Sequence, residues 1–431
     1  MTAKARRIAW AVTVAALAYS AVHFVHSGVI FPLAEPNLGK FEEETPALRE
    51  YLRTGEPVHF NNPVQYGAVF FGIVHPLILW THGERQFANW LYALQILFVG
   101  LAWAATWATL RRFVAVENRP IVMAWLAVLW LNFAPVYTTI AVKSVENWEL
   151  LLIATALWAH VRGRLWVMAI ALAAGTLIKI LPLFFFYYLL VTNRRAFLYA
   201  IVALIALLAI AQAIYGPQMG FWYLPQIAKS AAGNSYGLTW HENISLKAAI
   251  AKIVGRLETD PQRSGYIVAL TPGQLKAVTI IGDAAVIAVL AALTWLWMRP
   301  VVRDPRTIIW EWSLATVALL VISPNTTFEY AALALGAVAY GLVRIVGEER
   351  FREPRGRTRL YLFGAMFFLG VLLPRQLLNQ LTFVTALNRL TGYTHLNPSE
   401  AYQFYCFPLI GLLLLAAAIW RLRPIALEGR R

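Results

Sequence analysis

The sequence of 431 residues has few charged side chains and a single cysteine. Because Cys406 stands alone, an internal disulfide and a cysteine-based metal cluster are both excluded. Charged residues make up 14% of the chain, whereas an ordinary soluble domain has roughly a quarter. This shortage argues against a soluble globular enzyme, a disordered chain and a nucleic-acid-binding domain.

Aspartate is also scarce. The three aspartates, Asp260, Asp283 and Asp304, are far apart, so the chain has no Asp-x-Asp metal motif. A catalytic carboxylate outside the membrane is therefore expected to be a glutamate. Asp283 lies inside an apolar stretch, where we expect it to have a structural partner. A phosphate-binding loop of the form GxxxxGK[ST] is missing too, which argues against an ATP-driven pump.

Apolar residues, by contrast, make up 59% of the chain, and the mean hydropathy is +0.59. This composition predicts an all-α, polytopic integral membrane protein, with residues 1–431 forming one membrane domain. The first apolar stretch is expected to be a retained helix and not a signal peptide. The predicted membrane segments are 8–32, 88–110, 120–142, 148–161, 165–191, 196–216, 277–298, 307–324, 331–346, 360–374 and 406–420.

The net charge of +15 is first a signal of membrane orientation, because lysine and arginine favour the cytoplasmic side. All basic clusters can lie inside if Gly67–Trp80 does not cross the membrane and 165–191 makes two passes. We expect Pro76 to break the first segment and Lys179–Pro182 to interrupt the second. This map has about twelve passes and both termini in the cytoplasm. A competing map makes Gly67–Trp80 a full span and 165–191 a single helix, but it leaves four arginines outside.

On the preferred map, three large segments lie on the outer side of a cytoplasmic (inner) membrane: 33–87, 217–276 and 375–405. The first is expected to contain an amphipathic surface helix over about Pro46–Arg53 and the short re-entrant or surface segment Gly67–Trp80. Because the inner loops are short, we expect the active site on the outer, periplasmic side.

Three consecutive glutamates, Glu42, Glu43 and Glu44, precede the predicted surface helix. One interpretation is that they complement the positive end of the helix dipole on a solvated loop. The other is that one of them is a general base held above the membrane surface. The sequence leaves both interpretations open.

Lys179 lies inside an apolar stretch, where a lysine is costly and usually has a partner or a ligand. Its side chain either extends to the outer surface or contacts a phosphate, and a lipid phosphate would lie at this depth. Three further polar turns are predicted on the same side, and each is compatible with ordinary turn chemistry or with substrate binding. Their candidate substrate-binding residues are Glu146, Asn147, Trp240, His241, Glu242, Asn243, Asn325, Glu329 and Tyr330.

The order of these motifs resembles polytopic glycosyltransferases of the C-type fold, and most closely glycosyltransferase family 87, which contains polyprenyl-phosphate-mannose-dependent mannosyltransferase-like proteins. The resemblance extends over most of the chain. The motifs that carry it are Gly55-Glu-Pro57, the Tyr66 run into Pro76, Ser144–Asn147, Lys179-Ile-Leu-Pro182, Glu242–Leu246 and Ser323–Tyr330. One position departs from the family pattern, since Lys40 precedes Phe41 where the family usually has an aspartate.

The resemblance implies transfer of a sugar, with mannose as the first candidate, from a polyprenyl-monophosphate donor to a lipid or oligosaccharide acceptor. It implies that a glutamate among Glu42–Glu44 is the base, that Lys179 and Arg375 bind the donor phosphate, and that Tyr66 contacts substrate. It implies no cofactor and assigns no metal ligands, and its partners are membrane lipids, not nucleic acid. Transfer of another lipid-linked sugar is the main competitor within this class.

Two alternatives from other classes remain. One is a lipid-linked sugar carrier or flippase, which would need a continuous polar path through the helices. The other is a non-catalytic glycolipid-binding partner, which Lys40 keeps open because it stands at the position of the expected acid.

Overall fold

The computed structural model describes residues 3–26, 67–221, 238–259, 266–300, 303–347, 355–370, 382–393, 396 and 398–424. These residues form helices and one two-stranded antiparallel sheet. The chain divides into two compact units. Unit 1 comprises Met1–Arg112, Val116–Leu131 and Val136–Ala232, and unit 2 comprises Phe113–Ala115, Asn132–Pro135 and Gly233–Arg431.

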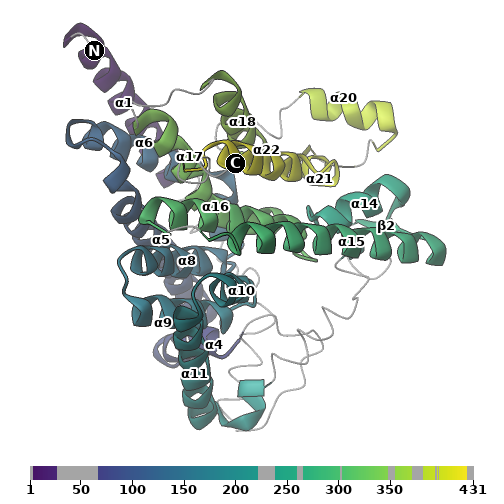
Figure 1. Cartoon of the computed structure of the whole chain (residues 1–431). Coiled ribbons are helices and arrows are strands. Elements are labelled where there is room, and N and C mark those ends of the chain that lie inside the picture. The colour runs from purple at the N-terminus through teal and green to yellow at the C-terminus, as the bar shows by residue number, and fades with distance from the viewer. Residues whose placement is uncertain are drawn as a thin grey trace. The chain divides into compact units, whose positions relative to one another are not determined.

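Unit 1 is a bundle of apolar helices. In Figure 1, α5, α8, α9 and α11 follow one another side by side, and contacts join each to the next. Helix α1 packs against α6, and α4 packs against α11. The helices are α1 (Ala3–His23), α4 (Ala68–Trp80), α5 (Glu84–Leu110), η3 (Arg111–Phe113), η4 (Val116–Asn118), α6 (Arg119–Leu131), α7 (Ala134–Ala141), α8 (Glu146–Val161), α9 (Leu165–Thr176), α10 (Leu183–Thr192) and α11 (Arg194–Phe221).

Helix α4 continues through Pro76, so the prediction that this proline breaks the segment is wrong. A proline inside a helix costs about 3 kcal/mol, because it removes one hydrogen bond and crowds the preceding turn. Phe70 and Phe71 before the proline and Ile78 after it pack into one apolar core. Their burial offsets that cost, since each large apolar side chain contributes about 1.5–3 kcal/mol.

The start of α4 lies against the interruption between α9 and α10. The amide of Gly67 donates to the carbonyl of Ile178 (2.9 Å), and the amide of Val69 donates to the carbonyl of Leu177 (3.2 Å). A Cβ atom on Gly67 would lie 2.2 Å from the Leu177 oxygen, so only glycine permits this approach.

Unit 2 contains the remaining described elements. Figure 1 shows α18 beside α22, and contacts also join α16 to α22 and α14 to α15. The elements are α14 (Leu246–Val254), β1 (Arg256–Thr259), β2 (Tyr266–Ala269), α15 (Pro272–Trp297), α16 (Pro305–Ile322), η5 (Phe328–Ala334), α17 (Leu335–Gly347), α18 (Arg355–Phe368), α20 (Thr382–Thr391), α21 (Pro398–Phe404) and α22 (Phe407–Arg421).

Local signals in the sequence explain where several of these helices begin. The Ser245 hydroxyl accepts the amide of Ala248 at the start of α14, and the Asp304 carboxylate accepts the amide of Thr307 at the start of α16. Thr271 and Gln274 form a reciprocal capping box at the start of α15. Each cap provides a partner for an amide that the helix itself leaves unpaired.

The predicted all-α fold is confirmed with one addition, the β1–β2 hairpin inside the segment 217–276. Val268 of β2 is buried, and Tyr266 and Leu257 pack on the same apolar cluster, so the hairpin is anchored by one face. Asp283 has the structural partner that its position predicted, because it forms an ion pair with Lys247 of α14.

The polytopic character is also confirmed. Among the described residues, six helices are long and apolar enough to cross a membrane, or seven if the bent pair Val116–Leu131 and Ala134–Ala141 is one span. Helices α9 and α10 are separate, as predicted, and each is shorter than the roughly 20 residues that a span needs. The count of about twelve passes and the membrane orientation remain predictions.

Candidate functional site

The polar turn between α7 and α8 has a specific backbone geometry. The amide of Lys143 donates to the carbonyl of Ile140 (3.2 Å), and the amide of Ser144 donates to the carbonyl of Thr139 (3.0 Å). Together these bonds form a Schellman termination, in which the residue after the helix adopts the left-handed conformation. That residue is Lys143, with φ of 52°, where glycine is usual. Residues other than glycine in this region are strained, and such strain is concentrated at functional sites.

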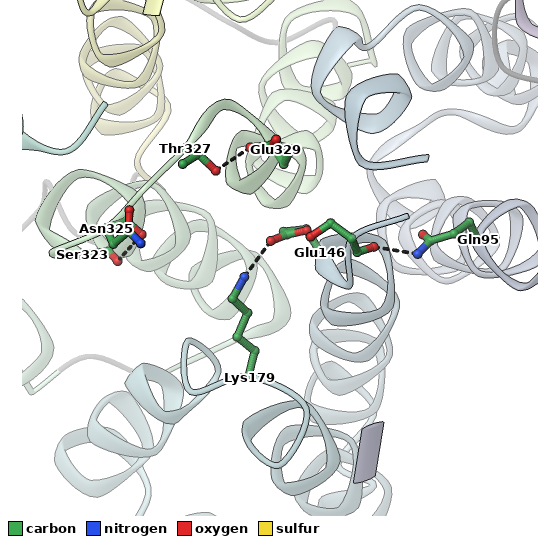
Figure 2. Close-up of polar contacts among 8 residues, drawn as sticks. Gln95, Glu146, Lys179, Ser323, Asn325, Thr327 and Glu329 are labelled. Atoms are coloured by element: carbon green, nitrogen blue, oxygen red, sulfur yellow. Dashed lines mark hydrogen bonds and ion pairs between the residues drawn. The ribbon is translucent and has the colours of Figure 1, made fainter. Parts of the chain in front are cut away.

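Lys179 lies in the interruption between α9 and α10 and points to this turn. Its Nζ donates to Oε1 of Glu146, the first residue of α8, at 2.7 Å (Figure 2). The side chain of Glu146 is 0% exposed and that of Lys179 is 8% exposed. Lys179 is therefore held in the bundle of unit 1 by a buried ion pair and does not extend to the surface.

Two further side chains complete this polar cluster. Gln95 of α5 donates from Nε2 to the carbonyl of Ser144 at 2.6 Å, which ties the turn to a helix that lies earlier in the chain. Glu149, on the first turn of α8, interacts electrostatically with Lys179 and Glu146. We call Gln95, Ser144, Glu146, Asn147, Glu149 and Lys179 the buried polar cluster; all are buried in unit 1.

Several atoms of the buried polar cluster have no hydrogen-bond partner within the described part of the chain. They include Oδ1 and Nδ2 of Asn147, both carboxylate oxygens of Glu149, Oε1 of Gln95 and the Ser144 hydroxyl. Native proteins leave few buried polar groups unpaired, because each costs about 1–3 kcal/mol. A group of them on one turn is therefore the arrangement expected of a binding site for a polar molecule.

Charge in this region is balanced and almost completely excluded from water. Lys143 and Lys179 are buried together with Glu146 and Glu149. Buried ion pairs contribute little net stability, since desolvation offsets most of the attraction. Their presence among apolar helices is better explained by a ligand that requires charge than by stabilisation of the fold.

In unit 2, Asn243 joins two of the predicted polar turns. Its Oδ1 accepts the amides of Ser245 (2.9 Å) and Thr326 (3.2 Å), and its Nδ2 donates to the carbonyl of Pro324 (2.9 Å). The amide of Ile244 donates to the carbonyl of Thr326 at 2.6 Å. Asn243 is 0% exposed, and these contacts make it a structural clamp between the turns.

We expect Asn243→Ala to lower the apparent melting temperature of the purified protein clearly, because it leaves two buried amides and one carbonyl unpaired at about 1–3 kcal/mol each. Asn325→Ala is the matched control, since its Oδ1 has no hydrogen-bond partner among the described residues. Thermal unfolding in detergent measures both. Equal melting temperatures for the two variants would contradict the clamp.

A second contact network surrounds Lys252 of α14. Its Nζ donates to the carbonyls of Asn243 (2.6 Å) and Gln403 (2.9 Å) and lies 3.6 Å from the Cys406 sulfur. Burial lowers the pKa of Lys252, and the neighbouring Cys406 partly opposes that shift. This lysine fixes α14 to the last turn of α21 and to Cys406, which directly precedes α22.

The neighbours of Asn243 in the sequence contact the hairpin. Trp240 bridges to Ile267 of β2, and Nδ1 of His241 donates to the carbonyl of Tyr266 at 2.7 Å. Burial lowers the pKa of His241, while the Tyr266 hydrogen bond and Glu400 act in the opposite direction. The imidazole is therefore neutral at pH 7, with Nε2 as its unprotonated nitrogen.

This pKa shift predicts a pH dependence of stability. A histidine that is harder to protonate when folded stabilises the protein above its unfolded pKa of about 6.5, and that contribution declines as the pH falls below it. The apparent melting temperature should therefore decrease more between pH 7.5 and 5.5 in the wild type than in His241→Asn, which keeps a donor for Tyr266. The slope is at most about 1.4 kcal/mol per pH unit. Identical pH profiles would contradict the assignment.

The third turn follows α16. Figure 2 shows the Thr327 hydroxyl donating to the carboxylate of Glu329, and the Ser323 hydroxyl lies 3.4 Å from the carbonyl of Asn325. Glu329 and Tyr330 belong to η5 and are buried. Unit 2 thus gathers Trp240, His241, Glu242, Asn243, Asn325, Glu329 and Tyr330, while unit 1 gathers Glu146, Asn147 and Lys179.

Other predicted residues lie outside the described ranges: Glu42, Glu43, Glu44, Tyr66 and Arg375, together with the amphipathic helix Pro46–Arg53. Within those ranges, no group of three or more His, Cys, Asp or Glu side chains is arranged to hold a metal ion. Because Glu42–Glu44 and Arg375 lie outside the described ranges, their assignments as base and phosphate contact remain predictions.

Three residues of these clusters were not predicted from the sequence. Glu149 could have been found, because it lies inside the predicted span 148–161, where a carboxylate is costly. Gln95 gave a weaker signal, as one of three amide side chains in an apolar helix. Lys252 gave no signal in the sequence, because a basic residue in the last turn of a helix is ordinary.

Comparison with known families identifies the class of protein. The model of glycosyltransferase family 87 matches residues 58–324, which is more than half of the chain. The chain belongs to glycosyltransferase family 87. It is accordingly a multi-pass membrane glycosyltransferase, which acts on a sugar donor and an acceptor. None of the curated proteins compared with it matches.

The family 87 match includes the whole buried polar cluster and Asn243, but not Thr326, which Asn243 contacts. It excludes Glu42–Glu44 and Arg375, and it ends at Pro324, immediately before Asn325. The resemblance predicted from the motif order is thereby confirmed for the central part of the chain.

Proposed function

We propose that this glycosyltransferase moves a sugar, with mannose as the first candidate, from a polyprenyl-monophosphate donor to a lipid or oligosaccharide acceptor at the outer face of the cytoplasmic membrane. The observation that carries the proposal is the buried Lys179–Glu146 ion pair, which lies where a helix is interrupted inside an apolar bundle. A donor that is already anchored in the membrane would bring its phosphate to such a site without a nucleotide or a soluble domain.

The reaction has two chemical requirements. The acceptor hydroxyl attacks the anomeric carbon, the bond between that carbon and the phosphate oxygen breaks, and the lipid phosphate leaves with the bonding electrons. A general base removes the hydroxyl proton, and a cation stabilises the negative charge on the departing phosphate. We assign the base to one of Glu42–Glu44 and the cation to Lys179, with Arg375 as a second contact.

The buried polar cluster supports the role of Lys179. Glu146 fixes the position of the ammonium group, and Gln95 in turn fixes the backbone of the turn that carries Glu146. Preorganisation of this kind is what electrostatic stabilisation of a transition state requires. The side chains of Asn147 and Glu149 provide donor and acceptor atoms that suit the hydroxyl groups of a sugar.

The proposal is tested with purified protein in nanodiscs, radiolabelled polyprenyl-phosphate sugars and a membrane lipid extract as acceptor. We expect the label to appear in a new lipid or oligosaccharide, with mannose tested first in a panel of donors. Reactions without acceptor measure hydrolysis. In a parallel arm with sealed proteoliposomes, a donor that crosses the membrane unchanged would indicate a carrier. A donor that is bound but never consumed would indicate a binding partner, and either result overturns the proposal.

A further inference from the structure

A groove on unit 1 has the chemistry of a phospholipid site. It lies where α9 and α11 begin, and its volume is about 250 Å³. Its lining residues are Gly163, Arg164, Leu165, Trp166, Val167, Arg195 and Tyr199. None of them belongs to the buried polar cluster.

The cationic groups of the groove have no acidic partner within the described part of the chain. Arg164 and Arg195 are exposed, and neither forms an ion pair with any carboxylate of the described ranges. Arg164 lies over the Trp158 ring at 5.2 Å, and Arg195 lies over the Tyr199 ring at 5.7 Å. Nη2 of Arg195 also donates to the Tyr199 hydroxyl at 3.4 Å, which leaves its other N–H groups for a ligand. A guanidinium group matches the oxygens of a phosphate.

Aromatic residues define the depth of the groove in a membrane. Trp166 and Tyr199 are in edge-to-face contact, with ring centroids 4.4 Å apart. Tryptophan and tyrosine are enriched at the level of lipid headgroups, where one part of the ring is apolar and the other is hydrated. The groove therefore lies at headgroup depth, beside two arginines.

An apolar surface continues from the groove along the same two helices. Leu198, Val202 and Ile205 are exposed on α11 at a spacing that places them on one face. Val167 and Ile170 are exposed on α9, which packs against α11. Exposed aliphatic side chains of this kind suit acyl chains.

We propose that this groove binds an anionic phospholipid, with the headgroup phosphate between Arg164 and Arg195 and the acyl chains along α9 and α11. Charge decides this choice of ligand, because a zwitterionic headgroup carries its own cation beside the phosphate and would add a third positive charge next to the two arginines. Basic pockets between membrane helices recognise anionic headgroups in this way. On the predicted orientation, the lipid belongs to the inner leaflet.

The test is native mass spectrometry of the full chain in detergent with added phosphatidylglycerol or phosphatidylcholine. Wild-type protein should retain phosphatidylglycerol selectively, and Arg164→Gln/Arg195→Gln should retain it about 30-fold more weakly, or about fivefold for each arginine. Arg357→Gln/Arg359→Gln is the control, since it removes two exposed arginines from α18 and should leave retention unchanged. The substituted side chains are exposed, so all variants should keep the wild-type melting temperature.

Arg164→Lys/Arg195→Lys provides a second variant, which keeps the charge and loses the planar guanidinium groups; intermediate retention is expected. Equal retention of phosphatidylglycerol by wild type and the glutamine variant would overturn the proposal, and so would equal retention of phosphatidylcholine. Inorganic phosphate is added in a separate arm. Displacement of the lipid by millimolar phosphate would assign the groove to the free anion instead.

Discussion

Lys179→Met should lower the turnover number for sugar transfer by about 10²–10³-fold, the usual effect of removing one group that stabilises developing negative charge. Methionine retains a long, flexible and apolar side chain, so the change removes the ammonium group and little volume. The measurement is initial rate at saturating labelled donor. A loss confined to KM, with turnover unchanged, would show that Lys179 binds the donor without acting on the leaving phosphate.

The single substitution also leaves Glu146 as an uncompensated buried charge, which costs about 3–5 kcal/mol. Lys179→Met/Glu146→Gln removes both charges and should return the apparent melting temperature close to that of the wild type. Turnover should stay low in this double variant, since the cation is still missing. If turnover recovers together with stability, the pair is structural only.

A matched pair elsewhere controls for the loss of any buried ion pair. Arg303 and Glu311 are joined by a contact of 3.2 Å in unit 2, and the Glu311 side chain is 3% exposed. Arg303→Met/Glu311→Gln should leave turnover unchanged. The comparison separates the chemistry at Lys179 from the general effect of removing two charges.

One of the three glutamates before the predicted surface helix should be essential for transfer. Changing that residue to glutamine should lower the turnover number by about 10²–10⁴-fold, because the acceptor hydroxyl then loses its general base. Glu42→Gln, Glu43→Gln and Glu44→Gln are assayed separately with saturating donor and acceptor. Glu50→Gln, in the same predicted segment, serves as the control and should be active.

The pH dependence of the rate provides a second measurement. The transfer rate of the wild type should fall as the pH drops below the pKa of the base. The low residual rate of the essential glutamine variant should not show this fall. Full activity in all three variants would contradict the assignment of the base to Glu42–Glu44. Glu149, which is buried beside Lys179, would then be the next carboxylate to change.

Local patterns explain what could be predicted from the sequence. An isolated lysine three residues before a proline, within an apolar stretch, predicted both the helix interruption and a partner for Lys179. Asp283 was expected to have a structural partner for the same reason, since a charge among apolar residues is costly. Alternation of apolar and basic segments similarly predicted the helices of the membrane domain.

Contacts between distant parts of the chain could not be predicted in this way. Gln95 and Ser144 lie 49 positions apart, and their contact depends on how α5 packs against α8. The clamp role of Asn243 likewise depends on the approach of Pro324 and Thr326, which follow some 80 positions later. Pro76 was misjudged because its local cost is visible in the sequence, whereas the core that offsets it is not.

The two hydrogen bonds at the start of α4 have a consequence for motion. The amides of Gly67 and Val69 are bonded to carbonyls of Leu177 and Ile178, which directly precede Lys179. These amide hydrogens can exchange with solvent only when the segment that carries Lys179 separates from α4. Their exchange rates therefore report how often the segment that carries Lys179 opens, and they do so without a change to Lys179 itself.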